Sequence, residues 1–217
     1  MKQSPVRVPY EPVEVAEATP NRRVLSKIRT RRKVLDAARA LFTERGYEAA
    51  TIRDIARYAG MSTGAVFANF QDKADLFEAI LMEDAERVAE LMREAAAAQG
   101  SVNDRLVAVF GAGYAYYLEN LPLLQATQAQ SWLRPMNAEL RARAASKVLL
   151  GVVSDLLREG AEKGELRQEF DVKLVSELLW DTYLANYRRA VYDGWGADTL
   201  RARLAEQAGL VLAGLRK

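Results

Sequence analysis

Residues 51–70 contain two helical segments that are each about two turns long. Thr51 can cap the first segment, with Asp54 as its reciprocal partner three residues later, and Gly60 ends it because glycine tolerates a left-handed backbone. Ser62 can cap the second segment. Helices this short are unstable alone in water, because nucleation costs more free energy than so few hydrogen bonds recover. The two segments must therefore pack on each other and on a longer neighbouring helix.

The longer helix comes directly before the two short ones. From Arg32 onward, apolar residues recur at the helical spacing i, i+3, i+4, i+7, i+8 until Gly46 interrupts them. These residues are Val34, Ala37, Ala38, Leu41 and Phe42. Two short capped helices joined at Gly60 and packed on a third helix form a helix-turn-helix unit. In such a unit the second short helix enters the major groove of DNA with its N-terminal residues at the base edges.

The first turn of the second short helix is bare. Thr63, Gly64 and Ala65 carry small side chains, which would let the helix start approach a duplex closely. Free backbone N–H groups at a helix start also favour phosphate. The inward-facing anchors are expected to be Val66 and Phe70. The alternative interpretation is a simple helical hairpin inside an α-bundle.

Positive charge is concentrated around this region. The whole chain has a net charge of +2, yet residues 22–75 hold twelve Lys and Arg against six Asp and Glu. Seven of these positive charges fall within residues 21–33, which contain no acidic residue. A local excess of this kind suits a partner with a negatively charged backbone. Together with the helix-turn-helix, it predicts double-stranded DNA as the partner. The alternative for residues 21–33 is a solvated helix start.

The rest of the chain is also predicted to be helical, so we expect an all-α protein. Helices are expected over residues 73–100, 101–118, 122–132, 137–163, 171–192 and 198–215. Their expected caps include Asp72, Ser101, Asp171 and Asp198. No segment alternates apolar and polar residues long enough to predict a strand. We expect a disordered tail over residues 1–21, a DNA-binding domain over residues 22–75 and a second helical domain over residues 76–217.

The composition excludes several classes of chemistry. The chain has no cysteine and no histidine, which removes disulfides, thiolate metal sites and the usual general base. Carboxylates alone could still bind magnesium or calcium, but no loop has the required spacing, so we expect no metal site and no cofactor. An all-α enzyme is the alternative from a different class, but no nucleophile–base pair supports it. No apolar run reaches membrane-span length and no signal-peptide pattern is present, so we expect a soluble cytoplasmic protein with no membrane partner.

Residues 34–81 read VLDAARALFTERGYEAATIRDIARYAGMSTGAVFANFQDKADLFEAIL and resemble the DNA-binding region of the tetracycline-repressor (TetR) family of bacterial regulators. The match spans these residues without a gap and combines three successive patterns: A-x-x-L-F-x-x-x-G-Y, T-x-x-x-I-A-x-x-A-G-x-S and G-x-x-F-x-x-F-x-x-K-x-x-L. The resemblance implies an all-α homodimer that binds a short palindromic operator. It further implies a C-terminal domain, here residues 76–217, that dimerises and binds a small ligand which loosens DNA, as in a repressor. The alternative is a dimeric regulator with no ligand response.

The resemblance also implies roles for individual positions. Phosphate contacts fall on Thr51, Lys73 and the positions of Phe67 and Asn69. Phe67 lacks the hydroxyl that many members carry there, whereas Asn69 can still donate a hydrogen bond. Arg53 falls on a base-reading position, and its alternative role is a solvated charge or a phosphate clamp. With the basic run and the helix cap included, the candidate DNA-binding residues are Arg31, Arg32, Thr51, Arg53, Ser62, Thr63, Gly64, Ala65, Phe67, Ala68, Asn69 and Lys73.

Aromatic residues cluster in the C-terminal part of the chain. Phe110, Tyr114 and Tyr117 share one face of a predicted helix, and Trp180, Tyr183 and Tyr187 share a face of another. Trp132 lies at the end of the helix predicted over residues 122–132. One interpretation is core packing. The other is a pocket with an apolar lining and a few phenol or indole hydrogen bonds. The resemblance places a ligand among the matching helices, so all seven are candidate ligand-binding residues for an aromatic or lipophilic effector.

The last two predicted helices carry wide apolar faces. These faces include Leu174, Leu178, Leu179, Leu200, Leu204, Ala208 and Leu212. More apolar surface lies there than the preceding helices are expected to cover. A two-fold four-helix interface between two copies would bury the remainder, so we expect the dimer to form through these helices.

Overall fold

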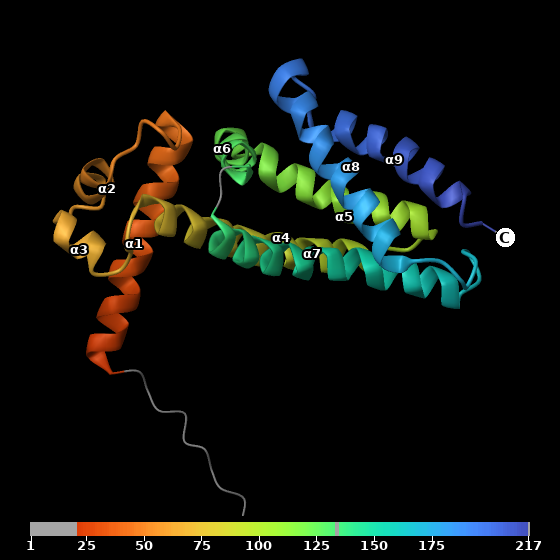
Figure 1. The fold of residues 1–217 in the computed structure, drawn as a ribbon, viewed down its shortest axis with the longest axis horizontal. Coiled ribbons are helices and arrows are strands. Elements are labelled where there is room, and N and C mark those ends of the chain that lie inside the picture. Colours follow the sequence, from red (N-terminus) through yellow and green to blue (C-terminus); the bar gives the residue numbers. More distant parts are fainter. Residues whose placement is uncertain (1–20, 133–134, 217) are drawn as a thin grey trace, which may run out of the picture.

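The computed structural model describes residues 21–132 and 135–216, and Figure 1 shows their arrangement. Within these residues every regular element is an α-helix, which confirms the all-α fold. The helices are α1 (Arg22–Arg45), α2 (Ile52–Tyr58), α3 (Thr63–Phe67), α4 (Lys73–Ala96), α5 (Val102–Leu118), α6 (Leu121–Ser131), α7 (Met136–Glu162), α8 (Val172–Asp193) and α9 (Ala197–Ala213). The predicted disordered tail lies outside the described residues except for its last residue, Asn21.

Five of the predicted N-caps are confirmed. In each case the capping side chain accepts the backbone N–H three residues on, as seen at Thr51, Ser62, Asp72, Ser101 and Asp171. The cap predicted at Asp198 is wrong, because α9 already begins after Gly196. Asp198 instead lies in the first turn of α9, where its negative charge still interacts favourably with the helix dipole.

The first helix is longer than the apolar periodicity indicates. Periodicity places its start near Arg32, whereas α1 begins at Arg22. The Asn21 side chain accepts the backbone N–H of Arg23 at 3.2 Å and so caps this extension. Arginine, lysine and leucine favour helix without needing a buried partner. The basic run is therefore a helical extension that projects beyond the packed part of α1.

The N-terminal core joins α1, α2, α3 and the first turns of α4. Its large buried side chains are Val34, Leu35, Leu41, Phe42, Ile55, Val66, Phe70, Leu76, Phe77 and Ile80. The turn between α2 and α3 is closed by the Met61 N–H, which donates to the Ala56 carbonyl at 2.8 Å. Gly60 in that turn has a φ of 67°, the left-handed conformation that suits glycine. The predicted helix-turn-helix is thus present, and Leu123 of α6 adds to its core.

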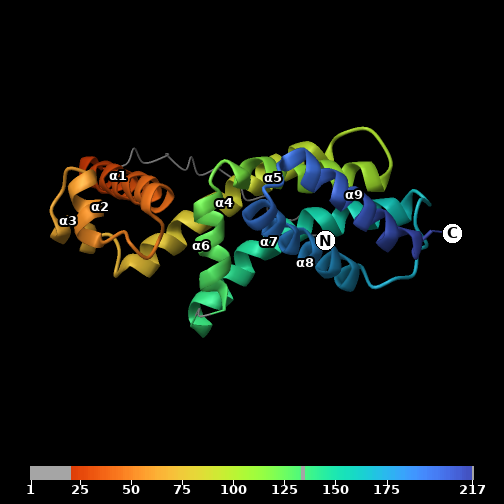
Figure 2. The same ribbon diagram turned by 90° about the horizontal axis from the view of Figure 1, so that it is seen from above.

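The C-terminal helices α5, α7, α8 and α9 enclose a second core, and α4 runs from the first core into the second (Figures 1 and 2). Two glycines permit close helix contacts there. A Cβ on Gly113 would lie 2.2 Å from the Tyr183 hydroxyl, and one on Gly160 would lie 2.3 Å from a methyl group of Val102. In both views α6 lies at the junction between the two groups of helices.

The wide apolar face of α9 is covered within the chain itself. Leu200, Leu204, Ala208 and Leu212 are all buried, and α9 packs against α5 and α8. The expectation that Leu204 belongs to a dimer face is therefore wrong, because another helix of the same chain already covers it. Large apolar side chains that stay exposed on these two helices are Leu174, Leu178 and Tyr192 on α8 and Leu210 on α9.

Candidate nucleic-acid interface and effector cavity

The N-terminal half of α3 faces solvent. Ser62 caps the helix, and Val66 and Phe70 are buried on its inner side, with 0% and 2% of their surface exposed. The candidate DNA-binding residues of this segment that are exposed are Ser62, Thr63, Gly64, Phe67 and Ala68, while Ala65 and Asn69 are half-buried. The outer face therefore carries small side chains plus one exposed phenyl ring.

Gly64 is not required by anything inside the protein. A Cβ at this position would meet only the Ser62 Oγ, at 3.8 Å, which is ordinary van der Waals contact. Glycine in a helix also costs stability relative to alanine, by about 1 kcal/mol. Gly64 weakens its own helix and relieves no internal clash. This suggests that the absence of a side chain leaves room for a partner outside the chain.

On α2 the reciprocal cap holds Thr51 and Asp54 together. The Thr51 hydroxyl donates to the Asp54 carboxylate at 2.5 Å, and this hydrogen bond is the largest of the effects that lower the pKa of Asp54. Arg57 also pairs with Asp54. Arg53 is exposed and makes no ion pair or side-chain hydrogen bond within the described residues. Its guanidinium is therefore available to a partner, unlike that of Arg57.

Two of the candidate arginines on α1 are already engaged. The Arg31 guanidinium donates to the Asn69 carbonyl at 3.3 Å and lies 4.3 Å from the centre of the Phe70 ring. Arg32 pairs with Asp36 at 3.0 Å and with Glu83 of α4 at 3.2 Å. Both arginines fasten the helices of the unit to each other, a role that sequence spacing could not reveal.

Lys73 and Asn69 also have partners inside the chain. The Lys73 ammonium donates to the carbonyls of Tyr47 and Glu48, at 2.8 and 3.3 Å, and lies 4.2 Å from the centre of the Tyr47 ring. It thereby anchors the loop between α1 and α2. The Asn69 side chain donates to the Ala65 carbonyl at 2.9 Å, while its Oδ1 atom is buried without a hydrogen-bond partner.

A second set of cations is exposed on the projecting end of α1. Their side chains make no ion pair or hydrogen bond within residues 21–132 and 135–216, and they are Arg22, Arg23, Lys27, Arg29 and Lys33. These charges belong to the basic run noted in the sequence. Their freedom distinguishes them from Arg31 and Arg32, so they are the residues of α1 best placed to meet phosphates.

A cavity of about 850 Å³ lies between the two groups of helices. Its walls come from α4, α5, α6, α7 and α8, and Tyr47 from the loop after α1 also lines it. The candidate ligand-binding residues that line it are Tyr117, Trp180, Tyr183 and Tyr187. Its volume falls within the range of small-molecule sites, about 300–1,000 Å³.

Three of the predicted lining residues lie elsewhere. Phe110 and Tyr114 pack directly on Tyr183, with ring centres 4.9 and 4.7 Å apart, so no space is left between these two aromatic faces. Trp132 is 91% exposed at the end of α6 and is absent from the lining. For Phe110 and Tyr114 the core-packing interpretation is the better one, because helical spacing does not tell which face meets a neighbour and which meets a cavity.

Behind the cavity wall, α8 carries a buried polar network. The Tyr114 hydroxyl donates to the Tyr183 carbonyl at 3.2 Å and accepts from the Asn186 amide at 3.1 Å, which also reaches Gln207 of α9 at 2.7 Å. Burial is the main cause that raises the pKa of Tyr114. Asn186 and Gln207 are not among the residues predicted from the sequence. The one sequence feature that could have indicated them is a polar residue on an otherwise apolar helix face.

The cavity lining combines buried apolar residues with exposed charged residues. Leu149 and Trp180 are buried, and Leu184 is half-buried. Arg141 of α7 has a side chain that is 53% exposed, and it forms a two-pronged pair with Glu78 of α4, with the Nη2–Oε2 distance at 2.6 Å. The hydrogen bond to Glu78 is the largest cause that raises the pKa of Arg141. An occupant would thus meet both lipophilic side chains and charged hydrogen-bonding groups.

Two family models match successive parts of the chain. The model for bacterial regulatory proteins of the tetR family matches residues 34–80, and the model for the C-terminal region of YsiA-like protein matches residues 82–187. The fatty acid metabolism regulator protein of Bacillus subtilis (strain 168) is 26% identical over 152 residues, which cover 69% of this chain and 77% of that protein.

Two further relatives extend over most of the chain. The HTH-type transcriptional repressor KstR2 of Rhodococcus jostii (strain RHA1) is 29% identical over 195 residues, covering 85% of this chain and 90% of that protein. The crystal structure of the transcriptional regulator FadR from Bacillus subtilis in complex with stearoyl-CoA matches with a TM-score of 0.73 at 21% identity. It covers 85% of this chain and 99% of that one, and at this identity it shows a shared fold.

The N-terminal part is a helix-turn-helix with an exposed first turn and free basic charges. One long helix joins it to a helical domain beside a cavity. This combination defines a two-domain DNA-binding transcriptional regulator. The chain belongs to the TetR family of bacterial regulatory proteins. None of the helices in the part of the chain that the structure describes combines the length and the apolar character needed to cross a bilayer.

Proposed function

We propose that this protein is a transcriptional repressor that binds a palindromic operator as a homodimer and leaves it when a lipophilic small molecule fills the cavity. Relatives over most of its length are named as a regulator and a repressor. The alternative is a dimeric regulator with no ligand response. The two differ in one respect, which is whether the cavity has a natural occupant.

On DNA, the first turn of α3 would enter the major groove. Thr63 and Arg53 supply the hydrogen-bonding side chains, while Gly64, Ala65 and Ala68 allow close approach. An arginine bidentate to guanine contributes about 1–3 kcal/mol of discrimination between bases. Thr51, Phe67 and Asn69 would border the phosphates or sugars. The free cations of α1 would meet the backbone, whereas Lys73 would act mainly by holding the loop before α2.

The dimer would form through α8 and α9. Leu174 and Leu178 are 62% and 49% exposed and lie four residues apart on one face of α8, and Leu210 of α9 is 78% exposed. Pairing the two helices with those of a second copy would bury these side chains in a two-fold four-helix interface. The dimer would hold two α3 helices at the spacing of successive major grooves, about 34–36 Å.

One observation supports the proposed ligand response: residues from both parts of the molecule line the cavity. Tyr47 and Phe77 come from the DNA-binding unit, and Trp180 and Tyr187 come from α8. An occupant that fits one relative placement of these walls better than another would shift the equilibrium between the two placements. Because FadR from Bacillus subtilis was crystallised with stearoyl-CoA, a long-chain acyl-CoA is our first candidate effector.

The test uses a DNA duplex selected by the protein itself from a randomised library. We expect stearoyl-CoA to weaken binding to this duplex by a factor of about 5–150, the usual range of coupling between two sites. Saturating duplex should weaken stearoyl-CoA binding by the same factor. Coenzyme A and stearate, titrated separately, show which half of the molecule is recognised. Equal stearoyl-CoA affinity with and without the duplex would exclude this effector.

A pair of tryptophan variants checks where the ligand binds. Leu184→Trp places a large ring at a residue that lines the cavity, and it should abolish stearoyl-CoA binding while the duplex still binds. Leu140→Trp adds the same ring at a side chain that is 60% exposed and outside the cavity lining, so it should leave both affinities unchanged. If both variants retain stearoyl-CoA binding, the ligand site is elsewhere.

A further inference from the structure

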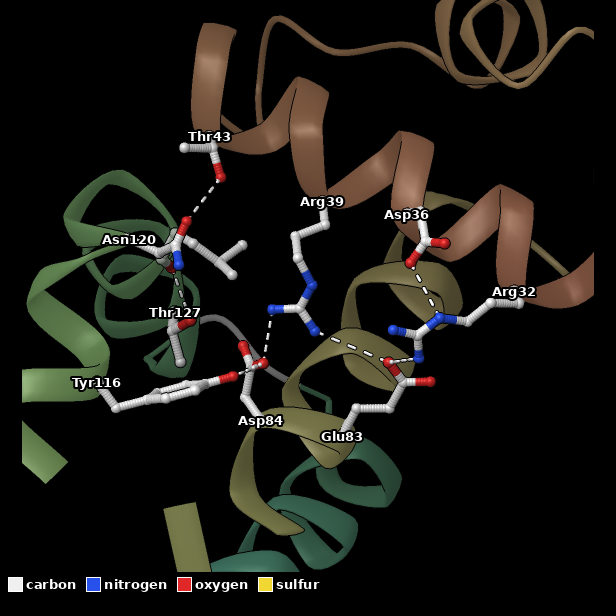
Figure 3. Close-up of polar contacts among 10 residues, drawn as sticks. Arg32, Asp36, Arg39, Thr43, Glu83, Asp84, Tyr116, Asn120 and Thr127 are labelled. Carbon is white, nitrogen blue, oxygen red and sulfur yellow. Dashed lines mark hydrogen bonds and ion pairs between the residues drawn. The ribbon is translucent and has the colours of Figure 1, made fainter. Parts of the chain in front are cut away.

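Asp84 of α4 is a buried carboxylate at the junction of the two parts of the molecule. Only 2% of this residue is exposed. One of its oxygens, Oδ1, accepts from the Arg39 guanidinium of α1 at 2.5 Å and from the Tyr116 hydroxyl of α5 at 2.7 Å (Figure 3). A single atom thus ties a helix of the DNA-binding unit, the connecting helix and a helix of the C-terminal domain.

The ion pairs around Asp84 are of a different kind. Glu83 lies 3.2 Å from Arg32 and 3.8 Å from Arg39, and its side chain is 36% exposed (Figure 3). Exposed pairs of this type are screened by water and salt and contribute little to stability. A buried carboxylate has no such screening, so removing one of its partners leaves a desolvated charge unpaired. Within this network the placement of α1 therefore depends chiefly on Asp84.

Helices α4 and α5 contribute residues both to this network and to the wall of the cavity. Ala85 and Tyr117 line the cavity. Their neighbours belong to the network, since Tyr116 donates to Asp84 and Asp84 holds Arg39. The rings of Tyr116 and Tyr117 meet edge to face with centres 5.4 Å apart. Burial, followed by the nearby Asp84, raises the pKa of Tyr116 to about 12, so its hydroxyl stays protonated and donates throughout the physiological range.

We propose that Asp84 is the positioning residue that couples the cavity to the DNA-binding unit. With both partners in place it holds α1 in the arrangement that binds operator. An occupant against Tyr117 shifts the adjacent Tyr116, weakens its bond to Asp84 and loosens the hold on Arg39. This proposal rests on the proposed function for its ligand step, while its positioning step applies to the ligand-free protein.

The first experiment tests positioning without any ligand. Asp84→Asn removes the charge but keeps nearly the same shape, and we expect it to weaken binding to the selected duplex by about tenfold or more, because fewer molecules hold the competent placement. Glu83→Gln is the matched control one residue away and should change binding by less than about threefold, as suits an exposed pair. Circular dichroism and sedimentation verify that both variants remain folded and keep the same assembly.

A lower melting temperature for Asp84→Asn with duplex affinity within about threefold of the wild type would overturn the positioning role, because a purely structural carboxylate changes folding and not the affinity of folded molecules.

Tyr116→Phe covers the case in which Asp84→Asn fails to fold. It keeps the ring and the charge pair, so it should weaken duplex binding less than about tenfold but measurably. Unaltered duplex affinity in Tyr116→Phe would count against the network.

The second experiment measures coupling with stearoyl-CoA as the probe. The ratio of duplex dissociation constants with and without the probe should fall to within about twofold of one in Tyr116→Phe, while the probe still binds the variant. Tyr192→Phe, an exposed tyrosine of α8, should keep the wild-type ratio. A wild-type ratio in Tyr116→Phe overturns the coupling route. If the probe fails to bind the wild type, the proposed effector class is wrong, and the Asp84→Asn comparison still decides the positioning role.

Discussion

At the scale of single residues, the candidate DNA interface combines small side chains that leave space with charged side chains that are free of partners. Gly64 leaves the first turn of α3 open although a Cβ would fit there. Phe67 presents a ring that is 55% exposed. Arg53 is free to reach a partner, whereas Arg57 is held by Asp54. The fold itself does not require the absent Cβ of Gly64, the exposed ring of Phe67 or the free guanidinium of Arg53, and the proposed contact with DNA would account for all three.

Gly64→Ala separates stability from DNA binding. The added methyl group fits, so we expect the variant to be more stable by about 0.5–1 kcal/mol, the usual gain of alanine over glycine in a helix. It should nevertheless bind the selected duplex more weakly, because the methyl group would stand at the base edges. Thermal unfolding and a duplex titration measure the two effects.

Gly151→Ala on α7 is the control, since a Cβ there also meets nothing within 4 Å. It should raise stability to a similar degree and leave duplex binding unchanged. If Gly64→Ala binds the duplex as tightly as the wild type, the first turn of α3 does not enter the groove.

At the scale of elements, α1 has two different parts. Its C-terminal part is bound into the core, and Arg31 and Arg32 fasten it to the segment after α3 and to α4. Its N-terminal extension has exposed cations without partners in the described chain. The dependence of DNA binding on salt should therefore distinguish the two parts.

Replacing Lys27, Arg29 and Lys33 with glutamine should weaken binding to all duplexes about equally. If each makes one phosphate contact, the slope of log affinity against log salt should fall by roughly three. Arg32→Gln is the comparison, because its guanidinium is engaged with Asp36 and Glu83, and it should change the slope by less than one contact. A loss confined to one duplex sequence would mean that the extension reads bases.

Glu159 of α7 forms an ion pair with Arg105 of α5 at 2.8 Å, which joins these two helices. Hydrogen bonds from Arg105, and then from Lys163, lower the pKa of Glu159 to about 2. A carboxyl whose folded pKa is depressed contributes stability above its unfolded pKa of about 4.3 and loses that contribution as the pH falls toward the folded value.

The melting temperature of Glu159→Gln should therefore be lower than that of the wild type at pH 7. The difference should shrink progressively between about pH 4.3 and pH 2. Glu206→Gln, which breaks a pair with Arg203 within a single helix, should show a smaller difference at every pH. A difference for Glu159→Gln that stays constant down to pH 2 would contradict the depressed pKa.

At the scale of the whole molecule, the apolar surface left over after folding points to the assembly. The inner faces of α8 and α9 are buried in the core of the same chain, whereas Leu174, Leu178 and Leu210 stay exposed. Two-fold pairing through these side chains would place two helix-turn-helix units on one operator.

Leu178→Glu should convert the dimer to monomers, because a charge without a partner would be buried at the interface at a cost of several kcal/mol. Sedimentation measures the change, and circular dichroism should show an unchanged helix content. Leu140→Glu places the same charge on an exposed part of α7 and should stay dimeric. A Leu178→Glu dimer would place the interface on another surface.

Local chemistry is what the sequence could determine by itself. Caps such as Thr51 and Ser62, the stop at Gly60 and the inward pair Val66 and Phe70 depend on neighbours a few residues away, and all agree with the structure. The all-α class and the helix-turn-helix follow from the same short-range rules. The motif within residues 34–81 then points to the family.

Only the tertiary structure decided which distant residues meet. The period of a helix shows that Tyr114 and Leu204 are on apolar faces, but the faces are covered by α8 and α5, which are remote in the chain. The partners of Arg31 and Lys73, and the meeting of Arg39, Asp84 and Tyr116, likewise join residues tens of positions apart. Such contacts depend on how whole helices cross, and crossing is set by the packing of all side chains together rather than by any local pattern.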